Sequence, residues 1–242
     1  SRGLGDVYKR QQVDLMYSLI HQQVDAIVLV PIDSKALVQP VVEAVRKGVP
    51  VINIDIRLDT QLLEQAGVEV AFVGPDNFAA AYEVGKLLDK KLRNEDKVAI
   101  IEGLTAADNA QQRKRGFIKA IEEKGLRLVA SEPADWETEK AAEVFQAMWM
   151  RYPDLKAVYC SNDAMALGVL QQMQEKNCYL PVVGFDNDAV MKEFLSTGKL
   201  VATADIFSSQ MAVRGIEFAL DVLEGKIENR GVHSTAYEII KQ

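Results

Sequence analysis

Residues 25–54 read DAIVLVPIDSKALVQPVVEAVRKGVPVINI, and this stretch decides the fold class. It opens with an apolar run at 25–30, continues as an amphipathic segment at 34–47, and returns to a second apolar run at 50–54. Short β-branched runs that alternate with amphipathic helices are typical of parallel sheets built from strand–helix–strand units. The stretch therefore predicts one such unit of an α/β fold.

The same alternation continues almost without a break to the end of the chain. The only long loop that we expect is the segment 55–67, DIRLDTQLLEQAG. We predict strands at 25–30, 50–54, 69–73, 97–101, 126–130, 156–160, 181–185 and 200–205, with a last short strand within 236–242. We predict helices near 34–47, 77–92, 108–124, 137–151, 162–175, 187–196 and 207–224.

Helix caps support these predictions. Ser34 precedes the first of these helices and Gly48 ends it, while Asp76 or Asn77 starts the next one. Pro40 falls inside the first helical pattern, where it is expected to remove a backbone hydrogen bond and to kink the helix.

The composition leaves room for two domains and gives no sign of a polyanion partner. The chain has 242 residues, 48% of them hydrophobic, and a formal net charge of −7. Its longest basic run is RKR at 113–115, so no nucleic acid partner is predicted. Cys160 and Cys178 are expected at opposite ends of neighbouring strands, too far apart for a disulfide, and are therefore interpreted as free thiols.

Motifs of enzymes and cofactor sites are missing from the sequence. It contains no GxxxxGK[ST], GxSxG or HExxH motif, and GLG at 3–5 does not continue into GxGxxG. His21 and His233 are the only histidines, too few for a metal cluster or a Ser/His/Asp arrangement. We therefore predict no catalytic residues, no metal and no cofactor.

Polar residues come directly after several of the predicted strands. In an open parallel sheet, ligands bind outside the carboxyl ends of the strands. Carboxylates and amides gathered there suit a neutral, polyhydroxylated ligand, because an ionised carboxylate can accept from two adjacent hydroxyls. The alternative is that each residue only caps the helix that follows it. The residues are Asp33, Asp55, Asn162, Asp163, Asp186 and Asp205.

Two further residues fit a sugar. Arg113 lies early on its predicted helix and presents a fork of donors suited to hydroxyl or ring oxygens, although it could equally be a solvated surface residue. Trp136 lies in a strand-to-helix turn, where its ring could stack on the C–H side of a sugar. Trp149, on a helix, is interpreted as a core residue.

Eight short motifs in register resemble those of one family. The chain resembles the periplasmic sugar-binding proteins of the ribose and allose type, the receptors of ABC importers, from about residue 11 to its C-terminus. No single motif is specific for the family, but the occurrence of all eight in this order is. The motifs are VPIDSKAL, INID, GPDN, DNAQQRKRGF, PADW, CSNDAMALG, VVGFDN and GKLVAT.

This resemblance implies two doubly wound parallel-sheet lobes joined by three hinge crossings, with the sugar between the lobes. The crossings would fall near Pro75-Asp76, Ile206-Phe207 and Thr235-Ala236. One lobe would comprise 1–75 plus 207–235, and the other 76–206 plus 236–242.

The resemblance also assigns roles to the residues already selected. Asp55 and Asp186 would accept from sugar hydroxyls, Arg113 and Asn162 would donate, and Trp136 would stack on the ring. Asp205, at the end of its strand, completes the predicted set.

Two departures from the family's pattern argue against plain ribose as the ligand. Ribose receptors carry Asp-Arg where this chain reads Asp55-Ile56-Arg57, and Ile206 stands where the family often has a glutamine. A polar site rejects sugars whose hydroxyls leave its buried groups unpaired.

The predicted function is that of a monomeric substrate-binding protein of a sugar ABC importer, with a monosaccharide or polyol as ligand and a membrane permease as partner. The expected location is the periplasm, or the cell surface as a lipoprotein. The alternative is the effector domain of a sugar-responsive repressor, although STGKLVATA at 196–204 resembles the receptors instead. A doubly wound enzyme is the weakest of the three hypotheses.

The family pattern predicts an incomplete first lobe. A strand, a helix and a strand would be expected before the first helix, whose apolar face is formed by Val13, Met16, Tyr17 and Ile20. SRGLGDVYKRQ at 1–11 resembles translated adapter sequence and is left out of the fold prediction. We expect an exposed apolar edge at DAIVLV, poor solubility and weak sugar binding.

Overall fold

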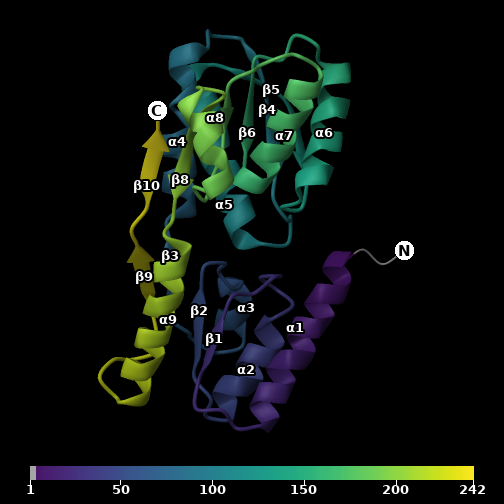
Figure 1. Cartoon of the computed structure of the whole chain (residues 1–242). Helices are drawn as coiled ribbons and strands as arrows, with labels where there is room; N and C mark the ends of the chain where they lie inside the picture. The colour runs from purple at the N-terminus through teal and green to yellow at the C-terminus, as the bar shows by residue number, and fades with distance from the viewer. Residues whose placement is uncertain (1–3) are drawn as a thin grey trace. The chain divides into compact units, whose positions relative to one another are not determined.

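The computed structural model describes residues 4–242, which form two compact units (Figure 1). Unit 1 contains the chain up to Pro75 together with Ala106–Asn109 and Ser208–Thr235. Unit 2 contains Asp76–Thr105, Ala110–Phe207 and Ala236–Gln242.

Unit 1 is built on a parallel sheet with the strand order β1-β2-β3-β9. On one face the helices α1, α2 and α3 share a core with β1 and β2, and α9 packs on the other face against β2, β1 and β3 (Figure 1). The strands are β1 (Ile27–Leu29), β2 (Val51–Ile54), β3 (Phe72–Pro75) and β9 (Val232–Thr235). The helices are α1 (Leu4–His21), α2 (Val38–Arg46), α3 (Thr60–Gln65) and α9 (Ser208–Leu223).

Unit 2 is built on a sheet with the order β10-β8-β7-β6-β4-β5, in which only β10 runs antiparallel. The strands are β4 (Lys97–Glu102), β5 (Arg127–Pro133), β6 (Ala157–Cys160), β7 (Val182–Val183), β8 (Leu200–Asp205) and β10 (Glu238–Lys241). The helices are α4 (Asn77–Gly85), α5 (Asp108–Lys124), α6 (Thr138–Arg151), α7 (Asp163–Glu175) and α8 (Lys192–Ser196), with 3-10 turns η1 (Leu88–Lys91) and η2 (Ala189–Met191).

Two layers of helices cover the sheet of unit 2. The helices α6 and α7 pack together against one face, around residues such as Phe145 and Val169. On the other face, Phe117 of α5 packs against Tyr159 of β6, with ring centroids 5.4 Å apart. The predicted α/β class with doubly wound parallel sheets is confirmed.

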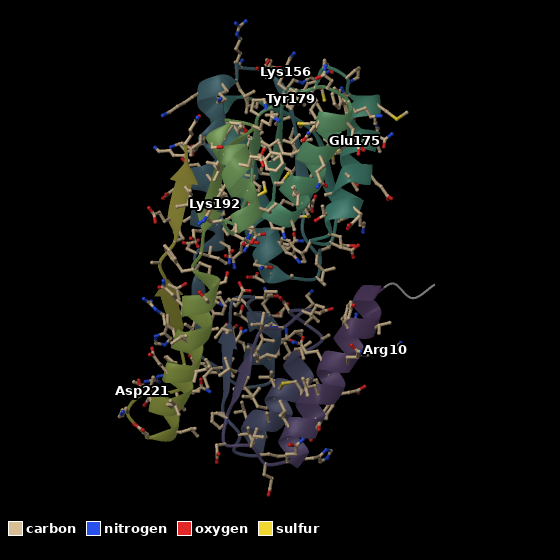
Figure 2. All side chains as sticks on the ribbon, viewed as in Figure 1. Arg10, Lys156, Glu175, Tyr179, Lys192 and Asp221 are labelled. Carbon is tan, nitrogen blue, oxygen red and sulfur yellow. The ribbon has the colours of Figure 1, made fainter. Side chains whose placement is uncertain are left out.

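The amino and carboxyl edges of this sheet lie at opposite ends of its parallel strands. Figure 2 labels Lys156 and Tyr179, which precede β6 and β7, and Glu175, which ends α7, all at the amino edge. Because β4, β5, β6, β7 and β8 run parallel, their carboxyl ends meet at the opposite edge. The residues that follow these strands are thereby brought together.

The sequence prediction missed two elements. The helix α3 lies inside the predicted loop 55–67, where the Asp59 side chain caps it by accepting from the Leu62 amide. The strand β9 was not predicted, because its sequence VHST is polar and three of its four residues are exposed. Pairing with β3 stabilises it instead.

Two helix starts also differ from the prediction. The helix α1 begins at Leu4, inside the segment 1–11 that was left out of the fold prediction. The helix α2 begins at Val38, so Ser34 is not its cap, and Pro40 occupies the third helical position. The amides of the first turn have no partner within the helix, and Pro40 therefore costs no hydrogen bond there. The expected loss of a helical hydrogen bond at Pro40 is therefore wrong.

Within residues 4–242, none of the helices has the length and apolar character needed to span a membrane.

Candidate functional site

Arg113 is the centre of the candidate site in unit 2. Its side chain is only 3% exposed, so the interpretation as a solvated surface residue is wrong. The Nε group donates to Oδ1 of Asn77 at 2.9 Å, and Nη1 donates to the Ser161 carbonyl at 2.8 Å. Nη1 also lies 3.4 Å from Oδ1 of Asp186. These contacts fix the guanidinium at the carboxyl edge of the sheet.

Two aromatic rings border this guanidinium. Its Cζ lies 3.7 Å from the ring centroid of the buried Phe185 and 5.5 Å from that of Trp136. A planar guanidinium stacks well on aromatic faces, and such contacts are strongest where water is excluded. The structure thus brings Arg113, Trp136 and Asp186 together, as predicted from three separate parts of the sequence.

Trp136 lies in a strained turn before α6. Asp135 and Trp136 both have left-handed backbone, with φ of 53° and 70°. The indole packs on Gly103, where a Cβ would lie 2.0 Å from the ring. Only glycine leaves space for the ring there.

Asp186 is held in a second strained turn after β7. Its φ is 107°, that of Asn187 is 59°, and its amide donates to the Ala204 carbonyl at 2.7 Å. The Asp186 carboxyl is about a quarter exposed, so it remains accessible beside the buried Arg113.

Asn162 and Asp205 both make structural contacts at this edge. Oδ1 of Asn162 caps α7 by accepting from the Met165 amide at 2.9 Å, which leaves the amide nitrogen as the donor group of the side chain. The Asp205 carboxylate accepts from Nδ2 of Asn187 at 2.9 Å and from the Phe207 amide at 2.8 Å. Capping and ligand binding are compatible for Asn162, whereas both carboxylate oxygens of Asp205 already hold protein donors.

In unit 1, Asp55 follows β2 and has left-handed backbone, with φ of 62°. Its amide donates to the Val73 carbonyl at 3.2 Å. The buried Asn53 braces the loop beyond it, because its side chain donates to the Ile56 carbonyl and accepts from the Leu58 amide, both at 2.8 Å. Arg57 lies over the Phe72 ring, 5.5 Å from its centroid.

Two other residues were predicted after strands: Asp33 fits the capping interpretation, and Asp163 is buried. Oδ1 of Asp33 accepts from the amides of Lys35 and Ala36, as a capping aspartate does. Asp163 is fully buried, and burial raises its pKa to about 7. The carboxylates of Asp186 and Asp188 add to this rise.

Two residues of this edge were not predicted from the sequence. Asn77, in the GPDN motif, accepts from Arg113. Glu102 ends β4, is almost fully buried, and accepts from Nζ of Lys114 at 2.7 Å and from the Ser131 hydroxyl. Glu102 directly follows the predicted strand 97–101, so the rule that selects polar residues after strands would have found it.

Parallel sheets covered by helices, with polar and aromatic residues at the carboxyl edge, define a class of proteins that bind a polar small molecule at that edge. The periplasmic binding protein domain family matches residues 5–227, and the chain belongs to this family.

The D-ribose/D-allose-binding protein of Pseudomonas aeruginosa is 42% identical over 234 residues, which cover 95% of this chain and 73% of that protein. A crystal structure of an ABC transporter solute-binding protein from Burkholderia multivorans is 40% identical, with a TM-score of 0.91, over 96% of this chain and 83% of that one. A solute-binding protein from Actinobacillus succinogenes, solved with bound D-allose, is 32% identical, with a TM-score of 0.89, over 96% of this chain and 84% of that one.

Proposed function

We propose that this chain is the substrate-binding protein of a sugar ABC importer. The observation that carries the proposal is the cluster of Arg113, Asp186 and Trp136, which offers a donor fork, a carboxylate and an aromatic face at one edge of the sheet. Relatives of the same family include a D-ribose/D-allose-binding protein and a D-allose complex.

The contacts of Arg113 support a role in recognising hydroxyl groups. Nε and Nη1 are committed to Asn77, Ser161 and Asp186, which leaves Nη2 as the donor group for a ligand. The fork is fixed before the ligand arrives, so little side-chain entropy is lost on binding.

The carboxylate and the aromatic ring supply the complementary contacts. The Asp186 carboxylate can accept from a pair of adjacent hydroxyls, and such charge-assisted hydrogen bonds are the strong ones. Trp136 would stack on the C–H face of the ring. Asn162 would donate through its amide nitrogen, and Asp205 would fix the turn that carries Asp186.

We further propose that Asp55 of unit 1 contacts the same ligand, and that the two units are lobes that close about crossings near Pro75-Asp76, Ile206-Phe207 and Thr235-Ala236. A ligand that gains contacts only in the closed form drives closure by that difference in affinity. The closed monomer would be recognised by a membrane permease at the periplasmic side. Binding takes place without turnover in this proposal.

Titration with D-ribose, D-allose and xylitol, followed by tryptophan fluorescence, tests the function. Trp136→Phe should remove the fluorescence response and weaken binding. Trp149→Phe is the matched control, because Trp149 packs on Phe145 of the same helix, at a ring distance of 5.5 Å. It should leave the response intact.

Two results would count against the proposal. One is the absence of any response to a wider panel of aldoses and polyols, with binding also absent by calorimetry. The other is chemical conversion of the bound sugar, which nuclear magnetic resonance of the recovered ligand would detect.

A further inference from the structure

Asp163 is a buried carboxylate at the carboxyl edge of the unit 2 sheet. It is the first residue of α7 and has no exposed surface. Oδ2 accepts from the Asp188 amide at 2.9 Å, and the Thr203 hydroxyl donates to the carboxylate at 2.9 Å and 3.0 Å from its two oxygens. Because Asp163 does not reach the surface, it can influence a ligand only through the groups that it holds.

Those groups are the two ends of the turn that carries Asp186. The backbone amide of Asp163 donates to the Phe185 carbonyl at 2.7 Å, and its side chain holds the Asp188 amide. Asp186 and Asn187 lie between these two points, both with left-handed backbone. Such conformations of non-glycine residues are strained and persist only where the surroundings enforce them.

Thr203 connects Asp163 to the middle of the turn. Its hydroxyl donates to Asp163 and accepts from the Asn187 amide at 3.2 Å. The Asn187 side chain in turn donates to Asp205. One hydroxyl therefore couples the buried carboxylate to the residue next to Asp186.

Gly184 makes this arrangement possible. A Cβ at position 184 would lie 2.0 Å from Oδ1 of Asp163, far inside contact distance. The carboxylate thus lies directly against the backbone that leads into the turn, and any side chain at this position would displace it.

We propose that Asp163 and Thr203 are positioning residues that fix the Asp186 carboxylate beside Arg113 and thereby set sugar affinity. The inference rests on the proposed sugar-binding function. Asp186 owes its position to the strained turn, and the contacts that hold the turn run through Asp163, Thr203, the backbone of β8 and the Asp205 side chain. A displacement of about 1 Å at a contact carboxylate is enough to weaken binding by an order of magnitude or more.

Calorimetric titration with D-allose and D-ribose tests the effect on binding. Asp163→Asn keeps the shape of the side chain but places an NH2 group against the Asp188 amide or the Thr203 hydroxyl, both of which donate to the ionised carboxylate of the parent chain. At pH 8, where that carboxyl is ionised, we expect at least a tenfold rise in Kd. Thr203→Val should raise Kd about fivefold, whereas Thr203→Ser, which keeps the hydroxyl, should stay within twofold of the parent chain. Wild-type affinity in both Asp163→Asn and Thr203→Val would overturn the proposal.

Amide hydrogen exchange without ligand tests the positioning separately from the function. Thr203→Val should raise exchange at Asn187, and Asp163→Asn should raise it at Asp188. The amides of β1 in unit 1 serve as the internal control for global destabilisation, and should not change.

The two experiments distinguish failure of the proposed function from failure of the positioning role. If the parent chain binds no sugar, the proposed function fails and exchange alone decides whether the turn is held by this pair. Unchanged exchange at Asn187 and Asp188 would overturn the positioning role. If Asp163→Asn does not fold, the comparison of Thr203→Val with Thr203→Ser still decides.

Discussion

Three of the proposed ligand residues combine a polar or aromatic side chain with left-handed backbone. Asp55, Trp136 and Asp186 have φ of 62°, 70° and 107°. Glycine would adopt these angles without strain, so the cost is tolerated here for the sake of a side chain. Strain at these positions supports the proposal that they bind ligand, since such outliers concentrate at functional sites.

Replacement of Arg113 by lysine should destabilise unit 2. Lysine keeps the charge but cannot reach Asn77, Ser161 and Asp186 together, so buried acceptors lose their donors. We expect the free energy of unfolding to fall by about 3 kcal/mol, measured by urea denaturation. Arg115→Lys, at an exposed position of the same helix, is the matched control and should change it by less than about 0.5 kcal/mol. Equal effects of the two variants would contradict the assigned contacts.

The buried carboxyl of Asp163 should make stability depend on pH. Its folded pKa is raised from an ordinary 3.8 to about 7, chiefly by burial, and the nearby carboxylates of Asp186 and Asp188 and the Cys160 thiol are its titratable neighbours. The folded state therefore binds more protons than the unfolded state between about pH 4 and pH 7. The resulting stabilisation is fully present below pH 4 and is lost as the pH rises through 7.

Asp163→Asn removes this dependence. The difference in Tm, parent chain minus variant, should therefore be larger at pH 4.5 than at pH 8, as measured by calorimetry. Asp221→Asn, which changes a carboxylate on the surface of α9 (labelled in Figure 2), controls for the loss of one charge. A constant difference in Tm across this pH range would contradict the pKa of Asp163.

The sequence predicted which residues gather at the carboxyl edge of the unit 2 sheet, because parallel strands force that outcome. It did not separate Asp33, which caps a turn, from Asp186, which lies beside Arg113. That distinction depends on where a carboxylate points and which donors it meets. Both depend on the tertiary structure, and the residues that follow a strand in the sequence do not determine them.

At the scale of elements, strands were predicted well wherever apolar runs are buried on both faces. The strands β2, β4, β6 and β8 lie within one or two residues of their predicted bounds. The strand β9 forms for another reason, because it completes the β3 edge with a polar sequence. The helix α3 is six residues long, too short to show a periodic pattern.

The helix α9 carries a row of exposed apolar residues. Val213, Ile216, Leu220 and Leu223 are each roughly half exposed and are spaced 3, 4 and 3 residues apart, on one flank of the helix. The opposite side of the helix packs on the sheet of unit 1 through residues such as Phe218 and Ala219. A contiguous apolar row of this kind favours self-association.

The double variant Ile216→Glu and Leu220→Lys should reduce self-association of the 242-residue chain without loss of fold, because both side chains already lie at the surface. Light scattering as a function of concentration measures the effect, and circular dichroism checks the fold. The control is the double variant Arg214→Glu and Glu217→Lys, at exposed polar positions of the same helix. If it lowers scattering as much, the apolar row is not responsible.

At the scale of the molecule, the sequence predicted two lobes from a family resemblance and not from any local pattern. The structure divides into two units, and their proposed movement about three crossings remains a prediction. Local sequence patterns report strands and helices, whereas the equilibrium between open and closed forms depends on small differences in free energy that no single segment carries. A measurement in solution is therefore needed.

Sugar binding should make the molecule more compact. To shift the open and closed forms from 1:99 to 99:1, the sugar must favour the closed form by about 5.5 kcal/mol, which several charge-assisted hydrogen bonds and a stacked ring can supply. Small-angle X-ray scattering should then show a lower radius of gyration at a saturating concentration of the tightest-binding sugar. Asp186→Asn should need a higher sugar concentration for the same change, because it weakens the contacts that distinguish the two forms. Tight binding with an unchanged radius of gyration would show that the ligand binds to one unit without closure.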